Sequence, residues 1–172
     1  MIFRHVEKRD LPQLHELFQE TISTVVEVEG LADVVSTNDE VQRLMQVVED
    51  SFNKDQTYFF VAEEQDELLG TIAITPPGEI IRNHCPELSE VLEIGCVYIK
   101  VSNQSQGVGR FLLTNIFDEA RKLNMTKSSL DAGFKSSQAY WMKKLGDPIH
   151  VVKDCWGKGA DHMVWEIDLI RK

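Results

Sequence analysis

A nearly continuous apolar segment at residues 92–101 constrains the fold more than any other feature of the sequence. A strand that is apolar toward both sides is stable inside a sheet whose two faces are both covered, usually by helices. Segments with apolar residues at helical spacing flank it in the chain, at residues 11–22, 37–52, 108–123 and 136–145. The sequence therefore predicts an α/β domain, α+β in some classification schemes, with helices flanking a central sheet.

Six other segments have the composition of strands, with aromatic and β-branched residues bounded by turn residues. They are residues 2–6, 57–63, 68–75, 128–131, 150–156 and 162–169. Short polar turns join two pairs of them as hairpins, whereas helical segments separate the others. This gives the order β-α-α-β-β-β-α-β-α-β-β and a mixed, largely antiparallel sheet, in one domain that covers residues 1–172. Residues 79–90 are predicted to form an irregular connection.

The start of the first predicted helix carries a capping signal. Asp10 precedes the apolar stripe, and Gln13 follows it by three residues, which is the spacing of a capping box. Pro12 between them costs no hydrogen bond in a first turn. We therefore expect the Asp10 side chain to cap this helix.

The charge balance excludes several classes of partner. The chain has 18 Lys and Arg residues against 28 Asp and Glu residues, which gives a formal net charge of −10. Such a surface repels nucleic-acid phosphates and anionic lipids. No apolar run approaches the ~20 residues of a membrane span, and the N-terminus lacks the apolar run of a secretory signal. We expect a cytoplasmic protein, monomeric or homodimeric, without nucleic-acid or membrane partners.

The cysteine and histidine residues give no metal signal. Three cysteines, Cys85, Cys96 and Cys155, are far apart and form no C-x-x-C pair, as is typical of a reducing compartment. No two histidines stand four residues apart, as a zinc-binding helix motif requires. His84 is adjacent to Cys85, but neighbouring residues in a loop are rarely a ligand pair. The sequence therefore predicts no bound metal.

The most informative segment, residues 93–110, has the pattern of a strand, a short polar loop and a helix that begins at two glycines. At the helix start, the amides from Gln106 to Arg110 have no partner within the helix and point the same way. Together with the helix dipole and the charge of Arg110, they form a site suited to a pyrophosphate. Gly107 and Gly109 let such a ligand approach the backbone closely.

Two other interpretations of this segment stay open. A strand-to-helix turn can use glycine for tightness alone, without any ligand. A dinucleotide-binding turn also combines glycines with a later acidic residue, and here Asp131 ends the next predicted strand. Against this second interpretation, Leu112 replaces the third glycine, and the turn comes late in the domain and several residues after its strand.

In three places the sequence resembles the GNAT superfamily of acetyl-CoA-dependent N-acetyltransferases. Gln104-x-x-Gly107-x-Gly109 is similar to the pyrophosphate signature of that family. The family's fourth strand has a pattern similar to Glu93-Ile94 followed by Val97 and Ile99. Its helix motif is similar to Ser136-x-x-Ala139-x-x-Met142-x-x-x-Gly146. Because the predicted element order is also the family's order, the resemblance covers nearly the whole chain.

The resemblance implies an N-acetyltransferase that uses acetyl-CoA as co-substrate and a primary amine as acceptor. It implies that the pantetheine arm pairs with the strand edge around residues 97–99 and that the loop binds the diphosphate. The implied cofactor-binding residues are Val97, Tyr98, Ile99, Gln104, Ser105, Gln106, Gly107, Val108, Gly109, Arg110 and Ser136. A catalytically weak acyl-CoA-binding or sensor module on the same fold is the alternative.

Glu93 is the implied catalytic residue. An amine with a pKa near ~10.4 must lose a proton before it attacks a thioester, and a carboxylate takes that proton directly or through water. Simple strand alternation places Glu93 on the same face as Val97 and Ile99, and Tyr98 on the opposite face. A surface glutamate at the start of a strand is the other interpretation.

The family's proton-donating tyrosine corresponds to Met142, whose thioether sulfur cannot donate a proton. Tyr140 is two residues away and therefore ~200° around the helix, so the role is not transferred to it. This departure motivates the alternative of a module without efficient turnover.

Acidic residues concentrate in residues 16–50, the segment that in the family walls the acceptor cleft. Nine carboxylates and a single arginine, Arg43, give this segment a net charge of −8. Such a wall raises the local concentration of a cationic amine. We therefore expect a polyamine, an aminoglycoside-like amine, or a lysyl or N-terminal amine as acceptor. In the other interpretation, these charges only solvate helix faces and a loop.

Overall fold

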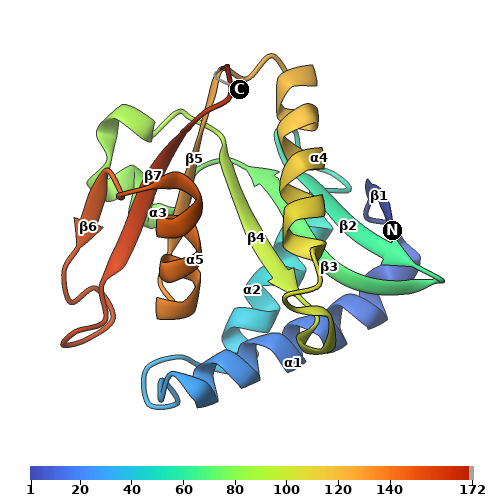
Figure 1. The fold of residues 1–172 in the computed structure, drawn as a ribbon, viewed down its shortest axis with the longest axis horizontal. Coiled ribbons are helices and arrows are strands. Elements are labelled where there is room, and N and C mark those ends of the chain that lie inside the picture. Colours follow the sequence, from blue (N-terminus) through green and yellow to red (C-terminus); the bar gives the residue numbers. More distant parts are fainter. Residues whose placement is uncertain (171–172) are drawn as a thin grey trace.

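The structure is a computed structural model that describes residues 1–170. These residues form seven strands in one sheet, in the order β1-β2-β3-β4-β5-β7-β6 (Figure 1). The strands are β1 (Ile2–His5), β2 (Tyr58–Glu64), β3 (Glu67–Thr75), β4 (Glu93–Ile99), β5 (Lys127–Ala132), β6 (His150–Val152) and β7 (His162–Asp168). Neighbouring strands are antiparallel except for β4 and β5, which are parallel. The predicted mixed, largely antiparallel sheet is confirmed.

Helices cover both faces of this sheet, as the apolar strand at its centre requires. The helices of the described residues are α1 (Leu11–Val28), α2 (Thr37–Asp50), α3 (Glu79–His84), α4 (Val108–Lys122) and α5 (Lys135–Leu145). The pair α1 and α2 packs on one face, and the pair α4 and α5 on the other (Figure 1). Within residues 1–170, no helix combines the length and apolar character needed to cross a membrane.

The order of the elements is as predicted, with one difference in the connection between β3 and β4. This segment was expected to be irregular, but it forms α3 and a 3-10 turn, Pro86–Leu88. Ile81, Cys85 and Leu88 recur at helical spacing, and all three are fully buried against Val164 of β7. The stripe was missed because it is short and lies in a polar, proline-containing segment.

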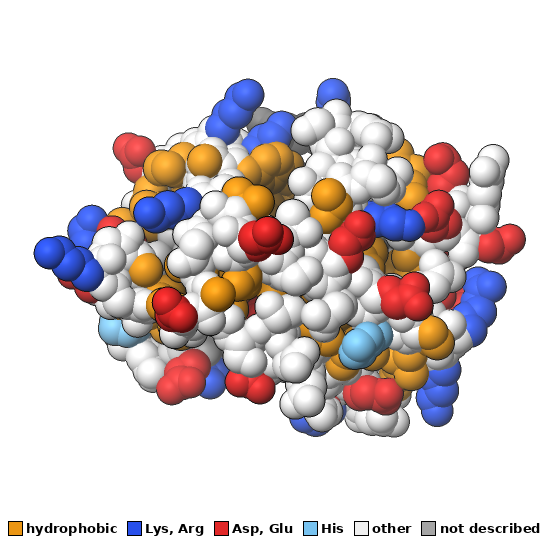
Figure 2. Space-filling model, turned by 90° about the horizontal axis from the view of Figure 1, so that it is seen from below, with side chains coloured by type: hydrophobic (Ala, Val, Ile, Leu, Met, Phe, Trp, Pro, Cys, Tyr) orange, Lys and Arg blue, Asp and Glu red, His pale blue; other side chains and the backbone are white. Residues whose placement is uncertain are grey.

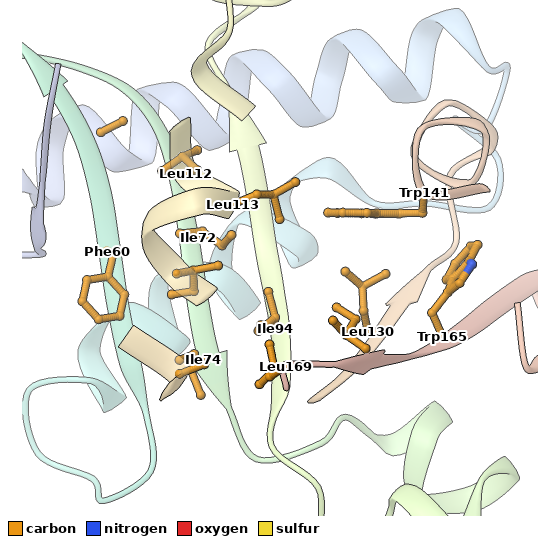
Figure 3. Packing of buried hydrophobic residues seen from close by; sticks show 14 of the residues in the cluster. Phe60, Ile72, Ile74, Ile94, Leu112, Leu113, Leu130, Trp141, Trp165 and Leu169 are labelled. Carbon is orange, nitrogen blue, oxygen red and sulfur yellow. The ribbon is translucent and has the colours of Figure 1, made fainter. Parts of the chain in front are cut away.

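The core on the α4/α5 side continues across the middle of the sheet. Figure 3 shows Ile72 of β3 and Leu112 of α4 on one side of β4, and Leu130, Trp141 and Trp165 on the other. All five side chains are buried. This shared core holds the two halves of the sheet together, so the sheet does not depend on a continuous ladder between β4 and β5.

The ladder between β4 and β5 is in fact short. Glu93 opposite Ser129 is the only residue pair in register between the two strands, which lie wholly within the described residues. The Ser129 amide donates to the Leu92 carbonyl at 3.1 Å. Beyond this point the two strands diverge (Figure 1). The diverging edge of β4 is therefore open on the side where β5 would otherwise pair with it.

A buried ion cluster ties β1 to β2 and to the start of α1. Arg4 donates to both carboxylate oxygens of Asp10, at 2.7 and 2.9 Å, and to Glu63 of β2 at 2.7 Å. Asp10, 3% exposed, also accepts the Glu7 amide at 2.8 Å. It does not cap α1, so the predicted cap is wrong. The sequence could not show that Arg4 would engage the carboxylate first.

Gln13, the other half of the predicted capping box, also has a different partner. Its side-chain oxygen accepts the Leu68 amide at 3.1 Å, and its side-chain nitrogen donates to the Asp66 carbonyl at 3.1 Å. The amide group therefore ties α1 to the turn between β2 and β3. Two hydrogen bonds to a distant hairpin replace the single local one that the motif offers.

Candidate active site

A β-bulge in β4 decides which side chains share a face. The register between β3 and β4 shifts between Thr71 and Ala73, and Cys96 adopts a positive φ of 52°. The Thr71 hydroxyl donates to the Cys96 carbonyl at 2.7 Å and so holds the bulge in place. A bulge of this kind adds one residue to the strand and changes the direction of the side chains that follow it.

The bulge interrupts the alternation of β4. Ile94, before it, packs on the α4/α5 side of the sheet, and Val97 and Ile99, after it, pack on that same side. Tyr98 packs on the α1/α2 side. Because Glu93 neighbours Ile94, it projects to the α1/α2 side as well. The expectation that Glu93 shares a face with Val97 and Ile99, and not with Tyr98, is therefore wrong.

Glu93 is held at the start of β4 by glycines. Its Oε2 accepts the Gly78 amide at 2.8 Å, at the start of α3. A Cβ on Gly95 would lie 2.9 Å from Oε1, so the carboxyl group folds back over a residue without a side chain. Burial, and next the negative charge of Asp131, raise the pKa of Glu93 to about 8 from its ordinary value of 4.5.

Asp131 lies beside Glu93, on the neighbouring strand. A Cβ on Gly78 would lie 3.3 Å from Oε2 of Glu93 and 4.0 Å from Oδ2 of Asp131, so the two carboxyl groups border the same point. His162, at the start of β7, brings its Nε2 to 3.1 Å from the Asp131 Oδ2. The indole of Trp156 donates to the Nδ1 of His162 at 2.9 Å.

Sequence analysis missed His162 and Trp156 as site residues. It considered Asp131 only as the acidic residue of a dinucleotide site, a role for which the position beside Glu93 gives no support. The three residues come from β5, β7 and the β6–β7 connection, and only the sheet order brings them together. Strand parity alone could have placed Asp131 on one face, but no local motif joins it to His162.

The predicted diphosphate loop leaves a row of backbone amides free. None of the amides from Ser105 to Arg110 donates to an acceptor in the part of the chain that the structure describes. Gly107 is the N-terminal cap of α4 with a φ of 90°, and nothing lies within 4 Å of the place where its Cβ would be. The Arg110 side chain is exposed at the same turn. These amides are not packed shut against the protein.

Glutamine side chains in this loop support its shape. Gln104 donates to the Ile99 carbonyl at 3.2 Å, and Gln106 donates to the Ser102 carbonyl at 2.7 Å. The Val108 side chain is buried in the core, so only its amide faces the loop. Tyr98 is another predicted cofactor residue. Its side chain packs on the α1/α2 side, and its hydroxyl donates to Glu40 at 3.3 Å.

Ser136 already has a partner within the chain. Its amide and hydroxyl donate to Oε1 of Glu29, at 2.9 and 2.8 Å, and the Lys135 amide donates to Oε2 at 2.9 Å. Glu29 follows α1, so a carboxylate from 107 positions away caps α5 in place of a local serine. The hydroxyl that was expected to contact the cofactor is used for this contact.

The two residues considered for the family's tyrosine differ in position. Met142 is 41% exposed on α5. The Tyr140 hydroxyl lies 3.5 Å from the place where a Cβ on Gly109 would be, so it reaches the first turn of α4. Partial burial raises the pKa of Tyr140. The sequence did not show that Tyr140, one turn before the end of α5, faces the predicted diphosphate loop.

The acidic segment is partly neutralised within the fold. Glu40 accepts two hydrogen bonds from Arg43, at 2.7 and 2.9 Å, and Asp50 pairs with Lys54 at 2.8 Å. Glu29 caps α5, as described above. On the face seen in Figure 2, acidic side chains are spread among basic and apolar ones. Because Arg43 is already counted in the net charge of −8, its pairing leaves that charge unchanged, whereas Lys54, outside the segment, offsets one carboxylate.

The comparisons with known proteins agree with this geometry. The model of the Acetyltransferase (GNAT) family matches residues 13–146. The fold is similar to that of the paiA N-acetyltransferase from Thermoplasma acidophilum, solved in complex with coenzyme A (16% identity, TM-score 0.67, 97% of this chain and 98% of that chain). It is similar to aminoglycoside 6'-acetyltransferase type Ii (18% identity, TM-score 0.67, 100% and 99%).

A third similar structure is the ribosomal-protein-alanine N-acetyltransferase from Brucella melitensis (21% identity, TM-score 0.66, 98% of this chain and 99% of that chain). No curated protein matches the sequence. At these identities the structures show likeness of fold, whereas the family match runs from α1 to the end of α5 and includes the whole of β4 and its loop. The chain belongs to the GNAT family of acetyltransferases.

Proposed function

We propose that the chain transfers the acetyl group of acetyl-CoA to a cationic primary amine, with Glu93 as the base. The observation that supports this most is the environment of Glu93, a half-buried carboxyl group beside Asp131, at the position from which β4 and β5 diverge. The free amides of residues 105–110 follow the other end of the same strand, roughly 20 Å away at ~3.3 Å per residue. A base and an anion site at the two ends of one strand suit an extended thioester.

The loop and the first turn of α4 would hold the diphosphate. Six amides without acceptors in the described chain face outward there, and the α4 dipole adds positive potential. The open space at Gly107 lets a phosphate approach the backbone, and Arg110 adds a full charge. Acetyl-CoA supplies the activated acetyl thioester, and the residues of the chain bind it and present the acceptor to it.

Glu93 would take a proton from the acceptor ammonium. Its pKa of about 8 lies between the ordinary value of 4.5 and the ~10.4 of an amine, so it is a stronger base than most carboxylates and still half ionised at pH 8. The amine nitrogen then bonds to the acetyl carbon as the C–S bond breaks. Of the two protons that the ammonium loses, one goes to Glu93 and the other to the departing thiolate.

The charges near Glu93 support a cationic acceptor. Glu93 and Asp131 border one point on the α1/α2 side, where two carboxyl groups attract an ammonium group. The similar structures carry the names of an aminoglycoside and a ribosomal-protein-alanine acetyltransferase, so small-molecule amines and peptide amines are both acceptors to test. In the acidic segment, Glu40 is paired with Arg43, and Asp50 is paired with Lys54, which lies outside the segment.

The proposal is tested by thiol release from acetyl-CoA in the presence of polyamines, aminoglycosides and peptides with free amines. We expect release with at least one cationic amine, at a rate that falls as ionic strength rises. Tight binding of acetyl-CoA without thiol release would support the alternative, a binding or sensor module. Binding of NAD in place of acetyl-CoA in a calorimeter would contradict both.

Two variants separate the base from the cofactor site. Glu93→Gln is expected to lower kcat/KM by about 10²- to 10⁴-fold, with the Kd for acetyl-CoA unchanged. Gly107→Asp places a negative charge among the free amides and is expected to raise that Kd at least about tenfold. Gly107→Asn is the matched control, because it has the same shape and also tolerates a positive φ. Equal losses in both Gly107 variants would contradict the diphosphate site.

A further inference from the structure

Three side chains lie one after another between the protein surface and the carboxyl group beside Glu93. The indole nitrogen of Trp156 donates to the Nδ1 of His162 at 2.9 Å. The Nε2 of His162 lies 3.1 Å from Oδ2 of Asp131, although its N–H is not aligned with that line. His162 is 7% exposed, and among the described residues its Nε2 has no hydrogen-bonded partner. We call these residues the Trp156–His162–Asp131 chain.

The direction of the indole hydrogen bond fixes the tautomer of His162. An indole N–H can only donate, so Nδ1 must carry a lone pair, and the single proton of the neutral ring is on Nε2, the nitrogen nearer Asp131. A second proton would have to enter at Nδ1, where it would break the hydrogen bond from Trp156. The hydrogen bond from Trp156 therefore holds the neutral ring of His162 in one tautomer.

The fit of this chain depends on a glycine. A Cβ on Gly133, directly after β5, would lie 3.0 Å from Nδ1 of His162 and 3.2 Å from Nε1 of Trp156. The indole and imidazole are therefore packed directly on the backbone that carries Asp131. Gln138 of α5 fixes this backbone from the other side, since its side-chain nitrogen donates to the Ala132 carbonyl at 3.1 Å.

Several other charged or titratable groups face Glu93. Asp131 is the anion that raises the pKa of Glu93, whereas the charges of Arg43 and Arg82 lower it. The Arg43 guanidinium group also donates a hydrogen bond to Glu40. The Cys96 thiol stays neutral, because burial raises its pKa to about 12. The groups are Arg43 from α2, Arg82 from α3, Cys96 from β4, Asp131 from β5 and, behind Asp131, His162 from β7.

We propose that the Trp156–His162–Asp131 chain is a set of positioning residues that keeps a fixed negative charge beside Glu93, so that Glu93 takes the proton of the acceptor ammonium. This inference rests on the proposed function. Asp131 supplies the charge, His162 packs against it with its Nε2 at 3.1 Å from Oδ2, and Trp156 holds His162 in the tautomer with a lone pair on Nδ1. None of the three needs to touch the acetyl group.

The test compares the pH dependence of kcat/KM in the wild type, Asp131→Asn and Trp156→Phe. Loss of the anion lowers the pKa of Glu93, so Asp131→Asn is expected to move the acidic limb of the profile down by about one pH unit or more. Trp156→Phe frees Nδ1 to take a proton, so a smaller shift in the same direction is expected. A merely structural role would instead reduce kcat/KM by the same factor at every pH.

Two further comparisons sharpen this test. Trp156→Phe is expected to add no shift in the Asp131→Asn background, because both changes act through one charge. Trp165→Phe is the matched control: it also removes an indole N–H, which donates to the Gly146 carbonyl at 2.9 Å, and it is expected to leave the acidic limb in place. The proposal would be overturned if Trp156→Phe moved the acidic limb further in the Asp131→Asn background, or if Trp165→Phe moved it as much as Trp156→Phe.

A spectroscopic readout separates this inference from the proposed function. In the free protein, ¹⁵N shifts of the His162 ring are expected to show a proton on Nε2, and the ¹³C shift of the Glu93 carboxyl group is expected to titrate at lower pH in Asp131→Asn. A wild type that acetylates no amine would contradict the proposed function. If the wild type is active and Glu93 titrates at the same pH in Asp131→Asn as in the wild type, the role proposed for the Trp156–His162–Asp131 chain is contradicted.

Discussion

Two pairs of carboxyl groups differ in what lies beside them: Asp10 and Glu63 are buried, and Glu93 and Asp131 are half-buried. Asp10 and Glu63 surround the guanidinium group of Arg4, which donates to both. Glu93 and Asp131 have one backbone amide, from Gly78, and the imidazole ring of His162. Burial raises the pKa of Asp10, but hydrogen bonds from Arg4 and Glu7 outweigh it and lower the pKa overall. The pKa of Glu93 is raised to about 8.

The difference shows how the same residue type serves two purposes. Around Arg4, the Asp10 carboxyl group is stabilised as an anion, and the cluster contributes to the fold. Around Glu93, the anion is destabilised, and the protein holds a group that readily accepts a proton. Such a strained site is expected where chemistry requires it, and the fold must be stable enough elsewhere to maintain it. The predictions below test this contrast, in order of expected effect.

Removal of the shared cation is expected to give the largest effect. Arg4→Met removes the hydrogen-bonded counter-charge of the buried Asp10 and leaves Glu63 only the exposed Arg9 at 3.8 Å, so the free energy of unfolding is expected to fall by about 3–5 kcal/mol. Urea denaturation followed by circular dichroism measures this. Arg9→Met is the control, because the Arg9 side chain is 60% exposed and its loss is expected to change stability little. Similar losses in the two variants would contradict the assignment of Arg4 as the centre of the cluster.

Replacing a carboxylate by an amide is expected to have opposite effects in the two regions. Asp10→Asn removes a charge that Arg4 stabilises and is expected to cost about 1.5–3 kcal/mol at pH 7. Because the pKa of Asp10 is lowered in the folded state, its contribution is present above pH 3.8 and is lost as the pH falls through the folded value. Glu93→Gln removes a charge that the fold disfavours, so it is expected to raise Tm at pH 8.

The effect of Glu93→Gln on stability depends on pH, and its direction follows from the raised pKa of Glu93. Between pH 4.5 and about pH 8, the folded state holds a proton on Glu93 that the unfolded state has lost, so wild-type stability falls as the pH rises through this window. In Glu93→Gln this part of the fall is expected to disappear. Thermal denaturation at pH 5 and pH 8 measures it, and equal pH dependence in both proteins would contradict the raised pKa.

A smaller effect is expected when the Glu93 carboxyl group is moved but kept. Gly95→Ala places a Cβ 2.9 Å from Oε1, and because the carboxyl group is the flexible end of its side chain, it moves while the strand stays. A displaced base is expected to lower kcat by roughly 10- to 100-fold, with a change in unfolding free energy below ~1 kcal/mol. Gly78→Ala, with its Cβ 3.3 Å from Oε2, is expected to lower kcat less. The reverse order would contradict this placement of the carboxyl group.

The smallest effect is expected at a third carboxyl group, which is only partly buried. Glu29 accepts three hydrogen bonds from Lys135 and Ser136 at the start of α5. Solvent weakens such contacts, so Glu29→Gln is expected to cost only ~0.3–1 kcal/mol in chemical denaturation. A loss of unfolding free energy as large as that of Arg4→Met would mean that burial of charge does not explain the difference between these carboxyl groups.

The order of elements followed from the sequence because each depends on local periodicity. The stripe at residues 11–22, the hairpin turn at Gln65-Asp66 and the end of α5 at Gly146 are all visible within a few residues. The short buried stripe of α3 was missed. The exchange of partners by Asp10 was missed as well, because its partner Arg4 lies in β1, outside the capping pattern.

The site was harder to predict, because it depends on where the chain departs from regular structure. Glu93 was predicted from the resemblance of its strand to the family's fourth strand, but the bulge at Cys96 changes the faces and is not visible as a pattern. His162 comes to lie beside Asp131 only because β7 pairs with β5 in the sheet. The free amides of the loop were predicted correctly, since they follow from the geometry of a helix start alone.

One titration decides whether Glu93 differs from an ordinary carboxylate. The ¹³C resonance of its side-chain carboxyl group, assigned by its absence in Glu93→Gln, is followed from pH 3 to pH 10 in the intact wild-type protein. A midpoint near 8 is the result that the geometry of Glu93 and Asp131 predicts. A midpoint near 4.5 would mean that solvent and neighbouring cations stabilise the anion, and Glu93 would then have no special capacity to deprotonate an amine.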